Sequence, residues 1–556
     1  MNEEPKPYHP DSCTPAGGVQ SFLLTAARSL VVMVVMAAVV WPMVALTLVF
    51  VAGMGAAPAV VDGPSNGATS VRFLDSRLAA LAWHTLQLVV PATLLASLMG
   101  IGAAVAWMRC GVRVRAIFLG GMLGVLLCAP MVFAFAWNGV FSSLFPPVVP
   151  EQKIIISDDV PPPPVVVRAP SQIPAGMRCV AFWAMWAWPI PAIGFALGWI
   201  GRGRVIVEAA SLEMPYWRAV HMVLWRAMLP WLLVPAFVVF ILLLNDYSVP
   251  HACGLVVYGT ELLAWSTQST DVRDALYPAL PQLLLLLLVG YPLWRTVRSL
   301  LSDEMEESGL RPRGSWIGLL VVSLLLVVTW FAPMVLLVVR LGSVAAVGET
   351  WRVYGRDIVL TVLLAWSAGL VSVGVGLALG RATSARWSWR GWLMAGFLLF
   401  GFLPGSIVGV SMIAAYNRPW FFWIYDGWAI VGLAYLARYG WIGCMAGLLM
   451  HSKRSRRLDE QAEVDGAGDW QVLRWMQLPR FGPLMLGVSF VIGALAIGDV
   501  TASSLVRTPA FSPVAHIMIE KFHRFEDAIL VALCLFVAVS AIPAALSFWF
   551  LIRRNS

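Results

Sequence analysis

The chain has 556 residues, of which 60% are hydrophobic and 12% are charged. A soluble protein carries about a quarter charged residues and under half apolar ones, so this composition excludes an ordinary soluble domain. The formal net charge of +8 does not indicate a nucleic-acid partner, because the basic residues lie in short clusters between apolar runs. Such clusters are typical of segments that orient a chain in a bilayer. The composition therefore predicts an all-α polytopic membrane protein.

The N-terminal segment 1–28 is polar and proline-rich, and the first long apolar run follows Arg28. That run is longer than the core of a signal peptide and lacks a convincing cleavage site, so we expect an uncleaved first helix and a cytoplasmic N-terminal tail. The seven cysteines are scattered, with no Cys-x-x-Cys pair and no metal-ligand spacing. We interpret them as small apolar packing residues.

Apolar runs that suit membrane-spanning helices fall into two sets of six. The first set predicts spans at approximately 29–54, 84–108, 116–139, 179–200, 229–245 and 276–297. The second set predicts spans at approximately 316–340, 358–380, 391–415, 427–450, 482–498 and 528–552. The sequence thus predicts about 12 transmembrane helices in two pseudo-symmetric halves, 29–300 and 316–556, joined by a cytoplasmic linker at 301–315.

The distribution of lysine and arginine tests this orientation, because these residues are enriched in cytoplasmic loops. With the N-terminus inside, 24 of the 38 basic residues fall in inside segments and 13 in outside segments, and Arg438 alone lies within a predicted span. The bias predicts that both termini are cytoplasmic. It also supports the number of spans, since a missed helix would invert every later loop.

Two of the predicted external loops stand out. Segment 140–178 contains PPVVPEQKIIISDDVPPPPVV and is expected to be an extended, proline-rich excursion without an assigned function. Segment 246–275 mixes polar and apolar residues and is expected to be partly re-entrant.

The two halves resemble each other most in a long cytoplasmic loop between the fourth and fifth spans. The first docking loop, as we call it, is VEAASLEMPYWRAVHMVLWRAMLP (207–230), and the second is DEQAEVDGAGDWQVLRWMQLPRFGP (459–483). Both begin with Glu-x-Ala and end in Leu-Pro, and Glu208 lies 252 residues before Glu460. We expect two short helices and a bend in each loop. In the second, Gly466 supplies a left-handed helix cap, and in the first, Pro215 suits the first turn of the next helix.

This pattern resembles the EAA loop of permease subunits of binding-protein-dependent ABC importers, and the iron(III)-type permease family in particular. The second loop matches the family at Glu460, Ala462, Gly466 and Pro479. The first loop matches it at Glu208, Ala209, Ala210, Pro215 and Pro230. It departs from the family where Met214 replaces the glycine, and its spacing from glutamate to proline is 22 residues against 19 in the second loop. The resemblance covers nearly the whole chain, but only the loops are specific.

The resemblance implies a type I ABC importer permease-like fold in the bacterial cytoplasmic (inner) membrane. It implies that the docking loops bind two copies of an ABC ATPase subunit, which hold the ATP, and that an extracytoplasmic substrate-binding protein delivers the substrate. Iron(III) is the substrate that the resemblance favours, while thiamine, a polyamine or an inorganic anion stay open. Membrane lipid is the other expected partner, and no cofactor is expected in this chain.

The chain itself carries no motif for ATP hydrolysis. A phosphate-binding loop needs Gly-Lys-Ser/Thr, and none of the four lysines follows a glycine. Any ATPase is therefore expected to be a separate polypeptide. We also find no Ser/His/Asp arrangement or paired carboxylates, so the sequence predicts no catalytic residue and no enzyme activity.

Three residues near the C-terminus, His516, Glu520 and His523, fall on one face of a predicted helix outside the last span. A metal site would need further ligands, so we expect an interfacial amphipathic segment and no metal. His251 and Asp246 face the same way in the first half, and one hypothesis places them beside this helix at the mouth of the pathway.

The candidates for lining the pathway are Asp246, Arg438 and Asp499. Arg438 lies within a span, where it must face protein or water, so either a buried pair with a carboxylate or a place in the pathway explains it. The two aspartates follow matched spans, and either a gate or a solvated helix end explains them. An ion-coupled secondary transporter is the alternative function, but it should carry several ionisable residues at the midplane, where this chain has few. A membrane-embedded enzyme or a scaffold is a further rival.

Overall fold

The fold is that of a computed structural model, which describes residues 30, 33–54, 76–144, 174–200, 204–226, 228–268, 277–285, 316–380, 389–450, 460–462, 464–540, 542–543 and 546. Within these ranges the regular structure is helical, with one isolated β-bridge between Thr508 and Phe511 and no strand. The predicted all-α class is confirmed for this part of the chain.

In the first part of the chain the elements are η1 (Met36–Val40), α2 (Trp41–Met54), α3 (Ser76–Met108), α4 (Val112–Leu127), α5 (Pro130–Leu144), α6 (Ala175–Ala187), α7 (Pro189–Gly198), α8 (Arg204–Ala210), α9 (Tyr216–Arg226), α10 (Leu229–Leu244), α11 (Ser248–Ala252), α12 (Tyr258–Gln268) and η3 (Tyr277–Ala279). In the second part they are α15 (Trp316–Leu326), η4 (Val327–Phe331), α16 (Ala332–Arg340), α17 (Ala345–Gly380), α18 (Trp389–Phe402), α19 (Gly405–Tyr416), η5 (Pro419–Phe421), α20 (Phe422–Tyr425), α21 (Ala429–Met450), α23 (Asp469–Gln471), η6 (Val472–Gln477), α24 (Leu478–Ile497), α25 (Thr501–Leu505), α26 (Val514–His523) and α27 (Asp527–Ser540).

Four helices in the described ranges are long and apolar enough to cross a membrane, namely Arg77–Met108, Trp316–Arg340, Ala345–Leu379 and Ala429–Gly447. The number rises to seven if each of three bent helix pairs counts as one span, and four shorter apolar helices of 10–17 residues accompany them. The chain is therefore a membrane protein. The number of twelve spans stays a prediction, and the N-terminal tail, the linker 301–315, most of the loop 140–178 and parts of the sixth and twelfth spans lie outside the described residues.

The apolar run at 116–139, predicted as one span, is two helices that meet at a sharp bend. Ile117–Leu127 and Pro130–Phe141 are inclined by 89°. The break has a covalent cause, because Pro130 lacks a backbone N–H and its ring excludes the preceding residue from helical dihedrals. The indole nitrogen of Trp186 donates to the carbonyl oxygen of Cys128 at 2.9 Å, which satisfies a carbonyl freed by the break. The run at 391–415 is divided in the same way at Pro404, between α18 and α19.

Two close helix crossings recur at matched places in the chain. A Cβ atom added to Gly100 of α3 would lie 2.6 Å from the carbonyl oxygen of Trp188 and 2.8 Å from the nitrogen of Ala192 in α7. A Cβ atom added to Gly376 of α17 would meet the carbonyl oxygen of Gly443 and would lie 3.0 Å from the nitrogen of Cys444 in α21. Small residues let helix backbones approach this closely in lipid. Of these partners, Ala192 and Cys444 are 252 residues apart, which is the spacing of Glu208 and Glu460.

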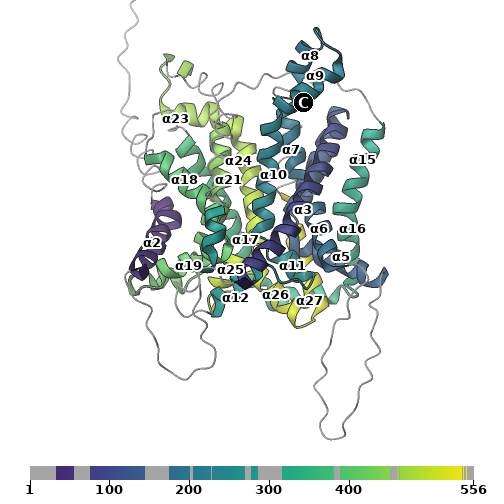
Figure 1. The fold of residues 1–556 in the computed structure, drawn as a ribbon. Helices are drawn as coiled ribbons and strands as arrows, with labels where there is room; N and C mark the ends of the chain where they lie inside the picture. The colour runs from purple at the N-terminus through teal and green to yellow at the C-terminus, as the bar shows by residue number, and fades with distance from the viewer. Residues whose placement is uncertain are drawn as a thin grey trace, which may run out of the picture.

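The helical bundle has two different ends, as Figure 1 shows. Helices α8, α9 and α23 lie at one end, and the short helices α11, α12, α25 and α26 lie at the other. Between them run the long helices α3, α10, α17, α21 and α24. We call the first the docking-loop end and the second the far end.

Candidate functional site

The first docking loop forms a helix, a turn and a second helix. Helix α8 ends at Ala210, and the amide of Met214 donates to the carbonyl oxygen of Ala210 at 3.1 Å to close the turn. Helix α9 begins at Tyr216, directly after Pro215. Met214 is not among the residues with positive φ, so this loop bends without the left-handed residue that the family pattern provides. Glu208, Ala209 and Pro215 are exposed.

The second docking loop turns at Gly466, as predicted. Its φ of 86° is left-handed, a conformation that glycine adopts without steric cost. The amide of Ala467 donates to the carbonyl oxygen of Ala462 at 2.9 Å across the turn. Glu460 is exposed, and the helical residues 460–462 lead into the bend.

Large apolar side chains are exposed to solvent on both docking loops. Leu212 is 88% exposed and Trp217 67% exposed on the first, and Val464 is 87% exposed and Trp475 72% exposed on the second. An arginine lies against the tryptophan in each case, Arg218 over Trp217 and Arg474 over Trp475, both at 5.5 Å from the ring centroid. Leu212 and Val464 are not among the residues that the motif of the docking loops predicts. A search for large apolar residues within an otherwise polar loop would have found them.

Each docking loop leads directly into a long apolar helix. Pro230 occupies the first turn of α10 and Pro479 the first turn of α24, where the missing N–H of proline costs no helical hydrogen bond. The two helices extend from the docking-loop end toward the far end (Figure 1). A movement of either loop is therefore carried by a helix to the far end.

Asp246 and Asp499 follow α10 and α24 at the far end, and each binds the start of the next short helix. Asp246 accepts from the amide and the hydroxyl of Ser248 at 3.0 and 2.6 Å. Asp499 accepts from the amide and the hydroxyl of Thr501 at 3.1 and 3.0 Å. The two aspartates are 253 residues apart, so the repeat of the docking loops extends to this end. Neither carboxylate is a solvated helix end, since each binds the turn between two helices.

The second carboxylate oxygen distinguishes the two aspartates. Oδ2 of Asp246 accepts from the indole nitrogen of Trp183 at 2.7 Å. Burial raises the pKa of Asp246, and the hydrogen bonds from Ser248 and Trp183 oppose that rise. Oδ2 of Asp499 finds no hydrogen-bond partner among the described residues, although Asp499 is 6% exposed. Tyr435 lies 252 residues after Trp183 and is within electrostatic range of Asp499, so a phenol stands where the first half has an indole.

Arg438 is buried in α21, one turn from Tyr435, and its exposed fraction is 7%. Its Nη1 atom has no hydrogen-bond partner in the described ranges, and no ion pair joins it to Asp499, which is also described. Tyr439 is within electrostatic range of both charged groups. The structure therefore brings two of the three predicted pathway residues, Arg438 and Asp499, to one buried polar region. The third, Asp246, occupies the position in the first half that corresponds to Asp499 in the second.

At the ends of α10 and α24, near this region, the first and second parts of the chain contact each other. The side-chain amide of Asn245, at the end of α10, donates to the carbonyl oxygen of Phe402 at 2.9 Å, at the break between α18 and α19. A Cβ atom added to Gly498, at the end of α24, would lie 2.7 Å from Cβ of Ala129, at the break between α4 and α5. Each helix that leaves a docking loop thus ends against a break between two helices in the other part of the chain.

The predicted meeting of His251 with the C-terminal helix is confirmed for His523, and its place at the mouth of a pathway stays a prediction. Nε2 of His251 lies 3.0 Å from Nε2 of His523. His516 turns elsewhere, with Nε2 2.6 Å from Nη1 of Arg507, and Glu520 is paired with Arg524 at 2.9 Å. Within the described ranges no group of three or more His, Cys, Asp or Glu residues is placed to hold a metal ion.

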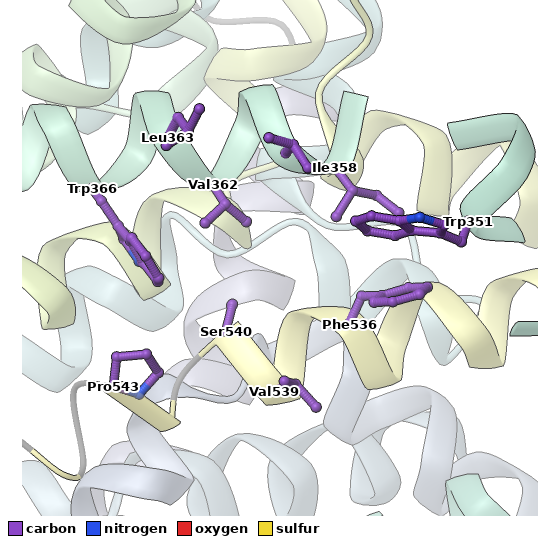
Figure 2. Close-up of a pocket in the computed structure, with 10 residues that line it drawn as sticks. Trp351, Ile358, Val362, Leu363, Trp366, Phe536, Val539, Ser540 and Pro543 are labelled. Carbon is purple, nitrogen blue, oxygen red and sulfur yellow. The ribbon is translucent and has the colours of Figure 1, made fainter. Parts of the chain in front are cut away.

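An apolar pocket of about 330 Å³ lies between α17 and α27. Figure 2 shows Trp351, Ile358 and Trp366 facing Phe536 and Pro543 across it. Ser540 supplies its one hydroxyl group. The pocket suits a hydrocarbon group and offers no charge to an ionic substrate.

No family model, curated protein or solved structure matches this chain.

Proposed function

We propose that this chain is the channel-forming permease subunit of an ATP-driven ABC importer. Its two docking loops bind two copies of a separate ATPase subunit, and its helices enclose one translocation path between two pseudo-symmetric halves. The observation that carries the proposal is the position of both docking loops at one end of the bundle (Figure 1).

The surface chemistry of the loops supports a protein partner. Exposed apolar side chains such as Leu212 and Val464 project from the two loops, and the bend of the second loop is built from small residues, Gly466 and Ala467. A partner that covers the apolar side chains gains hydrophobic burial. Arginines beside the exposed tryptophans add a charged rim to each surface.

The coupling follows from the helices that leave the loops. Helix α10 has 16 residues and spans about 24 Å at 1.5 Å per residue. Helix α24 has 20 residues and bends by 58° between Gly482 and Leu484. The far ends of both helices bind the turns at Asp246 and Asp499 and contact the breaks between helices in the opposite half. ATP-driven approach of the two loops would rock these helices and open the far end, which is alternating access by rigid-body motion.

In this proposal the docking-loop end is cytoplasmic and the far end faces outward across a bacterial inner membrane. An extracytoplasmic binding protein delivers the substrate to the far end. Iron(III) is the substrate that the resemblance of the docking loops implies.

Copurification tests the proposal. The wild type, solubilised in mild detergent, should bring down an ATPase subunit, and a Glu208→Ala/Glu460→Ala/Gly466→Ala variant should lose it while remaining monodisperse. Asp426→Ala, an exposed carboxylate after α20, is the matched control and should retain the ATPase. An ATPase absent from the wild type in several detergents would overturn the proposal.

An ion-coupled secondary transporter is the second candidate, because buried Arg438 and Asp499 are the kind of groups that such transporters use. The two functions differ in their energy source. Uptake into proteoliposomes that continues without ATP and collapses with the proton or sodium gradient would favour the second candidate.

A further inference from the structure

Two imidazole rings from distant parts of the chain meet at the far end. Nε2 of His251, in α11, is 3.0 Å from Nε2 of His523, at the end of α26, across 272 residues of sequence. Figure 1 shows both helices at the end opposite the docking loops. The contact joins α11, which follows α10, to α26, which follows α24, so it bridges the two halves.

The ring of His523 has a defined tautomer. Its Nδ1 atom lies 2.8 Å from the carbonyl oxygen of Ile519. A carbonyl oxygen only accepts, so Nδ1 carries the hydrogen and Nε2 of the neutral ring presents a lone pair toward His251. Metal-binding histidines are oriented in this way, by donation from the second ring nitrogen to a backbone carbonyl or a carboxylate.

The ring of His251 is held by aromatic neighbours. It stacks on Tyr247 with centroids 4.9 Å apart and planes inclined by 18°, and Phe522 lies 5.8 Å away. These ring contacts fix the orientation of the His251 imidazole, whose Nε2 atom faces His523.

We propose that His251 and His523 form a two-imidazole binding site for a divalent transition-metal ion, with copper(II) or nickel(II) the best fit. A metal about 2.1 Å from two nitrogens that are 3.0 Å apart would see them at about 90°. Such an angle suits the cis positions of a square-planar or tetragonal ion. Tetrahedral zinc(II) would need the nitrogens about 3.4 Å apart, so the rings would have to separate.

Proton positions change without a net release of protons. In the metal-free pair, Nε2–H of His251 donates to Nε2 of His523. Metal binding moves that hydrogen to Nδ1 of His251, so that both Nε2 atoms face the ion.

The charged groups around the pair leave the remaining coordination positions to water. On α26, Glu520 is paired with Arg524 and Lys521 with Glu526. On α6, next to α11, Arg178 donates to the side chain of Asn138 on α5. Asp246 is bound to Ser248 and Trp183. His523 is exposed to solvent, which gives the ion access. A metal held here would clamp α11 to α26 at the far end, whether or not an ATPase subunit is bound.

Electron paramagnetic resonance of copper(II) tests the site in the full-length protein, reconstituted in nanodiscs at pH 7.5. The wild type should show superhyperfine coupling to two equatorial nitrogens. His251→Gln and His523→Gln should each lose one of them and weaken copper binding at least about tenfold. His516→Gln, on the same helix but paired with Arg507, is the matched control and should keep the wild-type spectrum.

A two-nitrogen spectrum that survives in both variants, or that never forms in the wild type, would overturn the site. A measurement on the wild type alone guards against misfolded variants. Nickel(II) at pH 7.5 should protect His251 and His523 together from diethylpyrocarbonate while leaving the modification of His516 unchanged. Equal modification with and without nickel(II) at pH 7.5 would contradict the proposal. Neither result of the metal experiments changes the copurification of the ATPase. The metal site and the importer proposal can therefore be refuted independently of each other.

Discussion

Asp246 and Asp499 hold the same turn in two copies, but their surroundings differ. Both bind the first residues of a following short helix through an Asp-x-Ser/Thr pattern, which is visible in the sequence at 246–248 and 499–501. The pattern predicts the turn, because a carboxylate readily accepts from the amide two residues on. It does not predict that the indole of Trp183 donates a hydrogen bond to Asp246, because Trp183 lies on a distant helix. Nor does it predict that Oδ2 of Asp499 has no hydrogen-bond partner among the described residues.

Removing the indole donor of Trp183 should destabilise the protein. Oδ2 of Asp246 also accepts from the amide of Val249 at 3.2 Å, so Trp183→Phe removes the shorter of its two hydrogen bonds. Loss of a hydrogen bond to a charged group costs about 1.5–3 kcal/mol. Trp188→Phe is the control, because Trp188 is equally buried but its indole nitrogen has no partner among the described residues. Thermal unfolding in detergent should show a clearly lower Tm for Trp183→Phe than for Trp188→Phe. Equal Tm values would mean that the bond to Asp246 contributes nothing.

Arg438 should contribute little to stability and more to function. A buried guanidinium with an unpaired nitrogen carries a desolvation cost, so Arg438→Met should leave Tm unchanged or raise it. Substrate uptake by the variant should fall if the side chain lines the pathway. A large fall in Tm would instead identify Arg438 as part of a structural network.

At the scale of elements, the apolar runs predicted most helices, because hydrophobic length is a local property that the sequence displays. Helices α3, α17 and α21 lie where the runs at 84–108, 358–380 and 427–450 predicted them. The runs at 116–139 and 391–415 predict one helix each, whereas the structure divides them at Pro130 and Pro404. Proline chemistry would have indicated both breaks.

The two close helix crossings give a paired prediction. Gly100→Ala and Gly376→Ala each place a methyl group against the backbone of a neighbouring helix, and should destabilise the protein by about 1–3 kcal/mol or more. Gly102→Ala and Gly374→Ala are controls on the same helices, because nothing lies within 4 Å of their added Cβ atoms. Thermal unfolding should give a lower Tm for Gly100→Ala than for Gly102→Ala, and a lower Tm for Gly376→Ala than for Gly374→Ala. A tolerated Gly376→Ala would show that α17 and α21 are not in contact there.

At the scale of the whole molecule, the repeat in the sequence predicted two related loops on one side but not the contacts across the halves. Asn245 and Phe402, or His251 and His523, come together only through the packing of many helices, and no local pattern encodes such a pair. The docking loops were predictable because each is a short, self-contained turn. The sequence predicted that Arg438 and Asp499 are unusual charged residues of the bundle. It did not predict which residues surround them.

Site-specific photo-crosslinking tests the central claim most directly. A photoreactive amino acid at Leu212 or at Val464, the most exposed apolar residues of the two docking loops, should capture the same ATPase subunit in intact cells. The same probe at Trp423, an exposed residue of α20 outside both docking loops, should capture no ATPase. Crosslinks to an ATPase from both loops and none from Trp423 are what an ABC importer permease predicts. Failure of both loops to capture an ATPase, with the protein correctly inserted, would contradict it.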